Sequence, residues 1–154
     1  MTQGLLLAVA IGFVAGLRSM TAPALVAWGA HLRWLNLDGT PLSFMSSTLA
    51  VSLLTFLALA EFVADILPKT PSRIAPMGLF GRIVTGGLCG ACLSVGYGGG
   101  IAVGSIVGIA GAVAGAYIGY YTRRGLVNGL KVKDILIAIP EDIVAVGLGY
   151  LIVR

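Results

Sequence analysis

Long apolar segments dominate the pattern of hydrophobic and polar positions in this chain of 154 residues. Five such segments lie at about residues 4–32, 46–67, 80–97, 100–122 and 134–153. Each reaches about 18 residues or more, the length that a helix needs to cross roughly 30 Å of hydrocarbon. The pattern predicts an all-α, polytopic helical membrane protein with about five transmembrane helices, which form a single transmembrane domain over residues 1–154.

The composition agrees with a membrane protein. Hydrophobic residues make up 58% of the chain and charged residues only 10%, whereas soluble domains are about a quarter charged. A net charge of +4 would suggest a nucleic-acid partner for a soluble protein. Here we attribute the positive charges to membrane topology, so we expect the lipid bilayer and not nucleic acid as a partner.

Lysine and arginine are divided unevenly between the two sides of the predicted bundle. One side carries Lys69, Arg73, Arg82, Arg123, Arg124, Lys131 and Lys133. The other side carries Arg33 and Arg154. Because short cytoplasmic loops carry the positive excess, this distribution predicts a cytoplasmic N-terminus and a C-terminus outside.

The first apolar segment contains polar residues near its middle, in GLRSMTAPALVAW. Arg18 lies about fourteen residues along it, roughly 20 Å at 1.5 Å per residue. A charge at this depth is expected to face the protein interior, a water cavity or a partner. Thr21 as a cap and Pro23 in the first turn would begin a second half-helix. We therefore expect this span to be kinked or broken at Arg18 and Ser19, with backbone amides and the guanidinium converging on an anion or a buried carboxylate.

Four carboxylates are the natural partners of Arg18. Glu61 and Asp65 are four residues apart and share one helix face, and Glu141 and Asp142 lie at or near the start of the last span. One arginine against four acids leaves the site negative. Either some acids are protonated, because burial and like charge raise a carboxylate pKa, or a hard cation such as Na⁺, Mg²⁺ or Ca²⁺ completes the site. The structural alternative is that these acids only pair with interfacial cations or cap a helix.

Glycine spacing characterises the fourth segment. The glycines are Gly100, Gly104, Gly108, Gly111, Gly115 and Gly119. Such a glycine zipper lets helix backbones approach closely, either within one chain or between subunits, and we expect a homo-oligomer. Similar stretches in the first and fourth segments (VAGLRS, VAGAYI) and in the second and fifth (AEFVADI, PEDIVAV) further predict an inverted repeat of two spans plus two.

Two linking regions separate the later spans. Three prolines in residues 67–76 predict an extended connector. Residues 125–139 form either a short interfacial helix, with Pro140 opening the last span, or the link into a span that begins at about residue 134.

Other reactive side chains do not indicate catalysis. Cys89 and Cys92 lie in an apolar helix and are expected to be buried hydrophobic residues and not a redox pair. His31 lies among tryptophans in an expected interfacial belt. No nucleophile–base pair is evident, so we expect neither an enzyme nor a cofactor, apart from a possible bound cation.

The stretches GLRSMTAPALVAW, AEFVADILPKTPSRIAP, GRIVTGGLCGA, AGAVAGAYIGYYTRR and PEDIVAV together resemble a bacterial family of small integral membrane proteins, that of domain of unknown function 4126. The likeness covers nearly the whole chain. It implies a polytopic membrane fold rich in glycine and alanine, in the bacterial inner membrane, and it supplies no substrate.

The residues favour a small channel or transporter in which a solute or ion moves, linked to protons or ions, through a site of intramembrane arginine and carboxylates. The candidate site residues are Arg18, Ser19, Thr21, Glu61, Asp65, Glu141 and Asp142. The alternative is a membrane scaffold or accessory subunit whose charges form a purely structural network.

Overall fold

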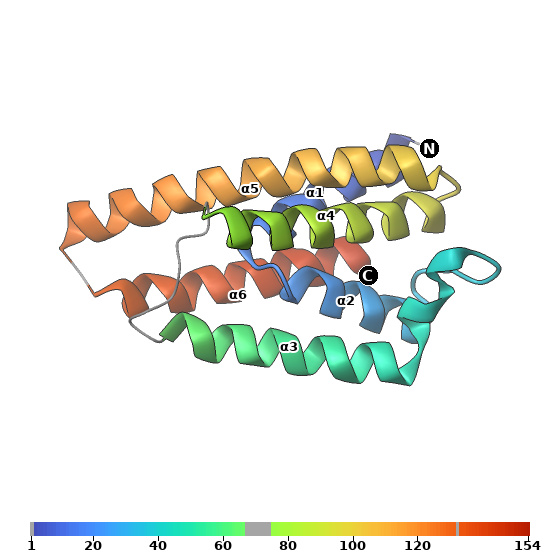
Figure 1. The fold of residues 1–154 in the computed structure, drawn as a ribbon, viewed down its shortest axis with the longest axis horizontal. Helices are drawn as coiled ribbons and strands as arrows, with labels where there is room; N and C mark the ends of the chain where they lie inside the picture. The colour runs from blue at the N-terminus through green and yellow to red at the C-terminus, as the bar shows by residue number, and fades with distance from the viewer. Residues whose placement is uncertain (1, 67–74, 132) are drawn as a thin grey trace.

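The fold is a helical bundle in a computed structural model that describes residues 2–66, 75–131 and 133–154 (Figure 1). Its helices are α1 (Thr2–Leu17), α2 (Thr21–His31), the 3-10 helix η1 (Pro41–Ser46), α3 (Thr48–Ile66), α4 (Pro76–Gly96), α5 (Ile101–Leu130) and α6 (Asp134–Val153). Four of these, α3 to α6, contain apolar windows long enough to cross a membrane, and α1 is a shorter apolar helix. The predicted all-α, membrane-spanning architecture is confirmed, whereas the count of five spans is not.

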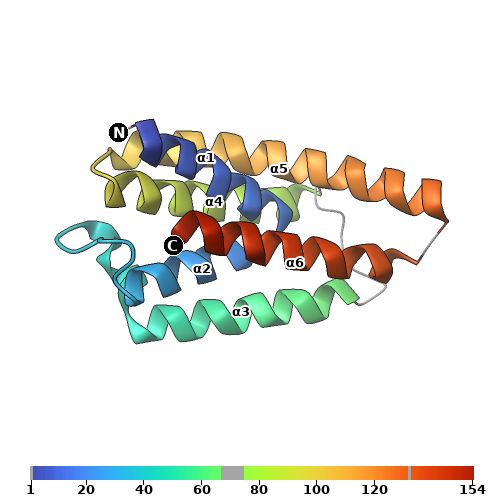
Figure 2. The same ribbon diagram turned by 180° about the vertical axis from the view of Figure 1, so that it is seen from behind.

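The first apolar segment is broken, and its two halves form a hairpin. α1 runs toward one end of the bundle and α2 returns toward the end from which α1 came (Figures 1 and 2). Near the start of α1, a Cβ on Gly4 would lie 2.9 Å from the Tyr97 Cβ, just after α4. The side chain of Leu35, just after α2, packs against Gly96 at the end of α4. Both ends of the hairpin therefore lie beside the C-terminal end of α4.

Glycines allow α1, α4 and α5 to pack with their backbones nearly in contact. A Cβ on Gly12 would meet the backbone of Gly108, and a Cβ on Gly90 would come within 2.7 Å of the Gly108 Cα. Gly86 also lies against Gly108. Since lipid provides no hydrophobic force between helices, such contacts are a main source of association in a membrane. In this chain they join three helices of one molecule.

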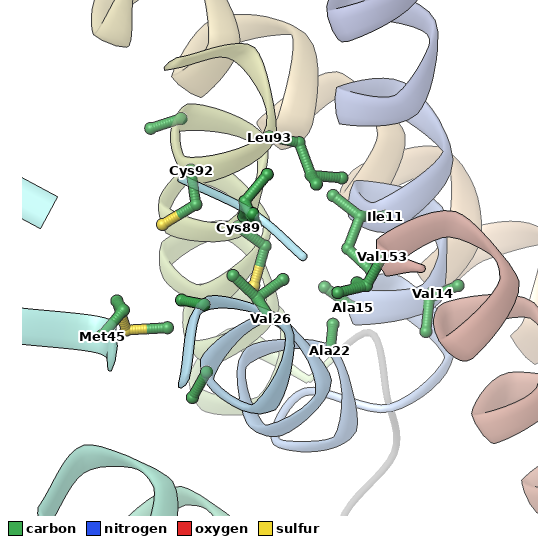
Figure 3. Close-up of a cluster of buried hydrophobic side chains, with 14 of the residues drawn as sticks. Ile11, Val14, Ala15, Ala22, Val26, Met45, Cys89, Cys92, Leu93 and Val153 are labelled. Atoms are coloured by element: carbon green, nitrogen blue, oxygen red, sulfur yellow. The ribbon is translucent and has the colours of Figure 1, made fainter. Parts of the chain in front are cut away.

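The second group of helices, α2, α3 and α6, packs beside this trio. Figure 3 shows the apolar cluster between the two groups, with side chains such as Val14 from α1, Val26 from α2, Leu93 from α4 and Val153 from α6. On their outer faces α3 and α6 leave large apolar side chains exposed. Those faces fit contact with lipid.

Two predicted boundaries change in the structure. α5 continues to Leu130, and α6 begins at Asp134, so the interfacial helix over residues 125–139 is wrong and the alternative start near residue 134 is correct. Pro140 lies inside α6 and does not open it. The predicted extended connector over residues 67–76 lies mostly outside the described residues, and Pro76 begins α4.

The hairpin also bears on two expectations about direction. Gly12 faces Gly108 and Gly16 faces Ala112, so α1 and α5 run in the same direction, and the predicted inverted repeat, which needs them antiparallel, is wrong. The two ends of the described chain lie at the same end of the bundle (Figure 1). The prediction that the two termini lie on opposite sides of a membrane assumed a single crossing by residues 4–32, whereas α2 returns toward the end where α1 begins. The sides on which the termini lie stay a prediction.

Candidate functional site

The tip of the hairpin consists of Arg18, Ser19 and Met20, between α1 and α2. Pro23 lies in the first turn of α2, where its missing N–H is not needed because the first N–H groups of a helix have no intrahelical partner. In a helix that continued from α1, the Pro23 ring would clash with the carbonyl of Ser19. The chain therefore starts a new helix here, and of the two expected forms of this span, kinked or broken at Arg18, the structure shows the broken one.

Glu61 of α3 brings its carboxylate to the N-terminus of α2. Its Oε1 accepts hydrogen bonds from the Ser19 backbone N–H (2.9 Å) and the Ser19 hydroxyl (2.8 Å). Its Oε2 accepts one from the Met20 N–H (3.0 Å). A helix N-terminus favours an anion because its amides point outward and its dipole is positive. Of the two partners expected for this tip, an anion or a carboxylate, the structure shows the carboxylate.

Arg18 is almost fully enclosed, with 1% of its side chain exposed. One guanidinium nitrogen, Nη1, lies 2.7 Å from Asp65 Oδ2 on α3, and Nη2 forms an ion pair with Asp142 Oδ1 on α6. The guanidinium also stacks over the Phe62 ring, 4.9 Å from its centroid, an arrangement that the ring quadrupole favours. Arg18 thus ties the hairpin to α3 and α6.

Two further arginines reach this region. Arg123 Nη1 of α5 lies 3.8 Å from both Asp65 Oδ2 and Glu141 Oε2. Arg82, in the second turn of α4, donates a hydrogen bond from Nη1 to the Gly16 carbonyl (3.1 Å), just before the tip. From the sequence, both arginines were expected at the cytoplasmic surface. Both arginines lie inside helices, α4 and α5, and not in loops. This position is the signal that their side chains point into the bundle.

Thr21 behaves differently from the prediction. It is the first residue of α2, and Met20 takes the capping position without a capping hydrogen bond from its own side chain to any residue that the structure describes. The Thr21 side chain is buried, and its hydroxyl has no hydrogen-bond partner within the part of the chain that the structure describes. The capping role expected of Thr21 is wrong, because the Glu61 carboxylate binds the amides of the tip instead.

The structure thus brings Arg18, Ser19, Glu61, Asp65 and Asp142 into direct contact, and Arg123 joins Glu141 to them. We call this group, with Arg82, the charge network. Arg18 and Arg123 pair with three of the four carboxylates, Glu61 binds the amides at the positive end of α2, and Arg82 adds a third positive charge nearby, so the negative excess calculated with Arg18 alone nearly disappears. Among the described residues, no group of three or more His, Cys, Asp or Glu residues has the arrangement of a metal site.

The remaining candidates lie away from the charge network. Cys89 and Cys92 are free thiols in the apolar core (Figure 3). His31 lies at the other end of α2, where its ring meets Trp28 edge to face with centroids 6.2 Å apart. Trp28 in turn donates from Nε1 to the Thr55 hydroxyl (3.0 Å). These residues support packing and not the charge network.

Comparisons with curated proteins and with solved structures found no match. A family model does match, over residues 5–154. This match agrees with the resemblance carried by the sequence motifs. The chain therefore belongs to the family described as "Domain of unknown function (DUF4126)".

Proposed function

We propose that the protein is a small membrane transporter or channel in which a small solute or ion moves past the charge network, coupled to protons or to another ion. The observation that carries the proposal is the helical hairpin whose charged tip is held by carboxylates of α3 and α6. Non-helical backbone at membrane depth is tolerated where protein buries it or where it lines an aqueous path. Broken helices with charged partners are the usual form of sites for ions and solutes in transporters.

Glu61 is the group that we assign to proton coupling. Its carboxylate holds the tip through three hydrogen bonds, and bonds to an ionised acceptor are about twice as strong as bonds to a neutral one. Protonation of Glu61 weakens the attachment of α2 to α3. The amides of Ser19 and Met20 then become available to a solute anion, which the adjacent Arg18 also attracts.

The arrangement in the membrane follows from the distribution of positive charge. Arg82, Arg123, Arg124, Lys131 and Lys133 belong to the end of the bundle that carries the charge network, and Arg33 and Arg154 to the other. By the positive-inside rule, the end with the charge network faces the cytoplasm. Both ends of the described chain then lie outside, in a bacterial inner membrane, and further copies of the chain are the partners that we expect there.

The second candidate is a scaffold or accessory subunit, and one specific observation favours it. The charges pair with one another across α2, α3, α5 and α6, and a closed ionic network needs no solute. In this role the charge network fixes the hairpin between the helices, and the outer faces of α3 and α6 bind another membrane protein.

Flux measurements separate the two functions. Purified protein is reconstituted into liposomes that contain a trapped pH-sensitive dye, and proton, Na⁺ and Cl⁻ gradients are imposed. The proposal expects flux above that of empty liposomes and a fall to the empty-liposome rate in Glu61→Gln, which imitates the protonated form. Arg124→Gln, an exposed neighbour of the charge network, should keep the full rate.

Two results would count against the proposal. Wild-type protein that never exceeds empty liposomes under these gradients leaves the scaffold as the better function. Flux that is unchanged in Glu61→Gln removes Glu61 from the mechanism.

A further inference from the structure

A second polar feature lies at the other end of α2. A pocket of about 400 Å³ opens between the end of this helix and the loop that follows it. The polar residues that line it are His31, Arg33, Asn36, Asp38 and Ser46. Its volume is within the range of small-molecule sites, roughly 300–1,000 Å³. The pocket lies at the opposite end of α2 from the charge network, so a ligand site there does not depend on the proposed function.

The loop around the pocket is anchored. Leu35 and Leu37 are buried in the core, and Asn36 between them accepts a hydrogen bond at Oδ1 from the Asp38 N–H (3.0 Å). His31 Nδ1 lies 2.9 Å from the Ser46 carbonyl. Because a carbonyl can only accept, Nδ1 is the donor of this contact, and in a neutral imidazole Nε2 is then the acceptor. The polar side chains therefore project from a loop whose shape is already set.

Arg33 occupies a backbone position that normally belongs to glycine. Its φ is +62°, in the left-handed region that L-residues other than Asn and Asp seldom adopt. The Arg33 N–H bonds to the Ala30 carbonyl and the Trp34 N–H to the Gly29 carbonyl, which is the Schellman arrangement of a helix end, with arginine where glycine is usual. A strained residue of this kind suggests that its side chain has a function.

The pocket contains opposite charges that do not satisfy each other. Arg33 and Asp38 both line it, both are exposed, and neither makes an ion pair with any residue that the structure describes. We propose that the pocket binds a small zwitterion, an amino acid or a related amino-carboxylate. The carboxylate pairs with the Arg33 guanidinium, and the ammonium group pairs with Asp38 and with Nε2 of His31.

Binding by full-length protein in detergent or nanodiscs tests this assignment. Glycine, β-alanine and 4-aminobutyrate, whose charges lie progressively farther apart, are titrated by calorimetry and by thermal shift. Acetate and methylammonium serve as probes with one charge each. At least one zwitterion should bind saturably and more tightly than either singly charged probe.

Two variants locate the site. Arg33→Gly and Asp38→Asn should each weaken binding by roughly tenfold or more, the loss expected for one charge-assisted contact. Arg33→Gly keeps the backbone conformation, so its loss of binding cannot be ascribed to misfolding. Arg154→Gln, at the same end of the bundle and outside the pocket, should bind as the wild type does.

Four outcomes would overturn the proposal. They are saturable binding of acetate alone, saturable binding of methylammonium alone, binding of no probe, and zwitterion binding that survives in both Arg33→Gly and Asp38→Asn. The first two would indicate a site for a single charge, and the last would place the zwitterion elsewhere.

Discussion

Replacing Arg18 by methionine should destabilise the bundle strongly. Arg18 is 1% exposed and pairs with two carboxylates, Asp65 and Asp142. Removing one member of a buried ionic group costs about 3–5 kcal/mol, because charges remain without their partner. Here the lower part of that range applies, since Asp65 keeps Arg123 at 3.8 Å and the two acids are 17% and 23% exposed. We expect about 3 kcal/mol, a factor of roughly a hundred in the unfolding equilibrium.

The assay is reversible unfolding in mixed micelles of a mild detergent and dodecyl sulfate, followed by tryptophan fluorescence. Arg124→Met is the matched control, because Arg124 is exposed, and it should shift the free energy of unfolding by less than about 0.5 kcal/mol. The triple variant Arg18→Met, Asp65→Asn, Asp142→Asn removes every charge of this contact. It should recover most of the lost stability, because neutral groups no longer need buried partners. A single variant as stable as the wild type would refute the reasoning, and so would a triple variant that is less stable than the single one.

Three shorter predictions concern other parts of the fold. Gly108→Ala should prevent close packing and lower the free energy of unfolding by several kcal/mol in the same assay, because its Cβ would meet the backbone of α4. Gly125→Ala lies on the same helix, where no described atom is within 4 Å of the added Cβ, and it should instead raise the free energy of unfolding by about 0.5–1 kcal/mol. Arg33→Gly should raise the free energy of unfolding by about 1 kcal/mol by relieving its positive φ, and a loss of stability would show that the arginine side chain is structural. Cysteines introduced in place of Thr2 and Arg154 should react with an impermeant maleimide from the same side of the membrane, and labelling from opposite sides would exclude a re-entrant hairpin.

The sequence predicted the helical content and the break at Arg18 for sound reasons. The length of an apolar segment identifies a membrane span. In a continuous helix the Pro23 ring would clash with the backbone carbonyl four residues earlier, at Ser19, and a new helix start avoids this clash. The same reasoning pointed to a buried carboxylate at the tip, and Glu61 takes that position. These features depend on local sequence and on the cost of buried charge.

The direction of the chain after the break could not be predicted in this way. A kinked span and a hairpin have the same hydropathy, because both keep residues 4–32 in apolar surroundings. The length of the segment carried a signal. Its helices of 16 and 11 residues are about 24 and 16 Å long, and together they exceed one crossing of the hydrocarbon core but fall short of two. The glycine contacts of α1 with α5 decide which path the chain takes, and such contacts join residues nearly a hundred positions apart.

Arg82 and Arg123 were missed for a related reason. Counting positive charges assigns arginines to a side of the membrane, but it does not separate those in loops from those that point into the bundle. Arg123 lies within a helix that continues to Leu130, beyond the end expected at residue 122. Once α5 is that long, its arginine lies beside the acids of α3 and α6.

α2 physically connects the two candidate sites. Its N-terminus holds Glu61 through Ser19 and Met20, and its C-terminus ends at Arg33, beside the pocket. If this helix of 11 residues moves as a rigid unit, a shift at one end is transmitted to the other. Coupling between two sites is reciprocal: if a change of state at the tip alters the affinity of the pocket for a zwitterion by some factor, the bound zwitterion alters the equilibrium between the two states of the tip by the same factor. An unchanged affinity in that variant would mean that the pocket and the charge network act independently, whatever each of them binds.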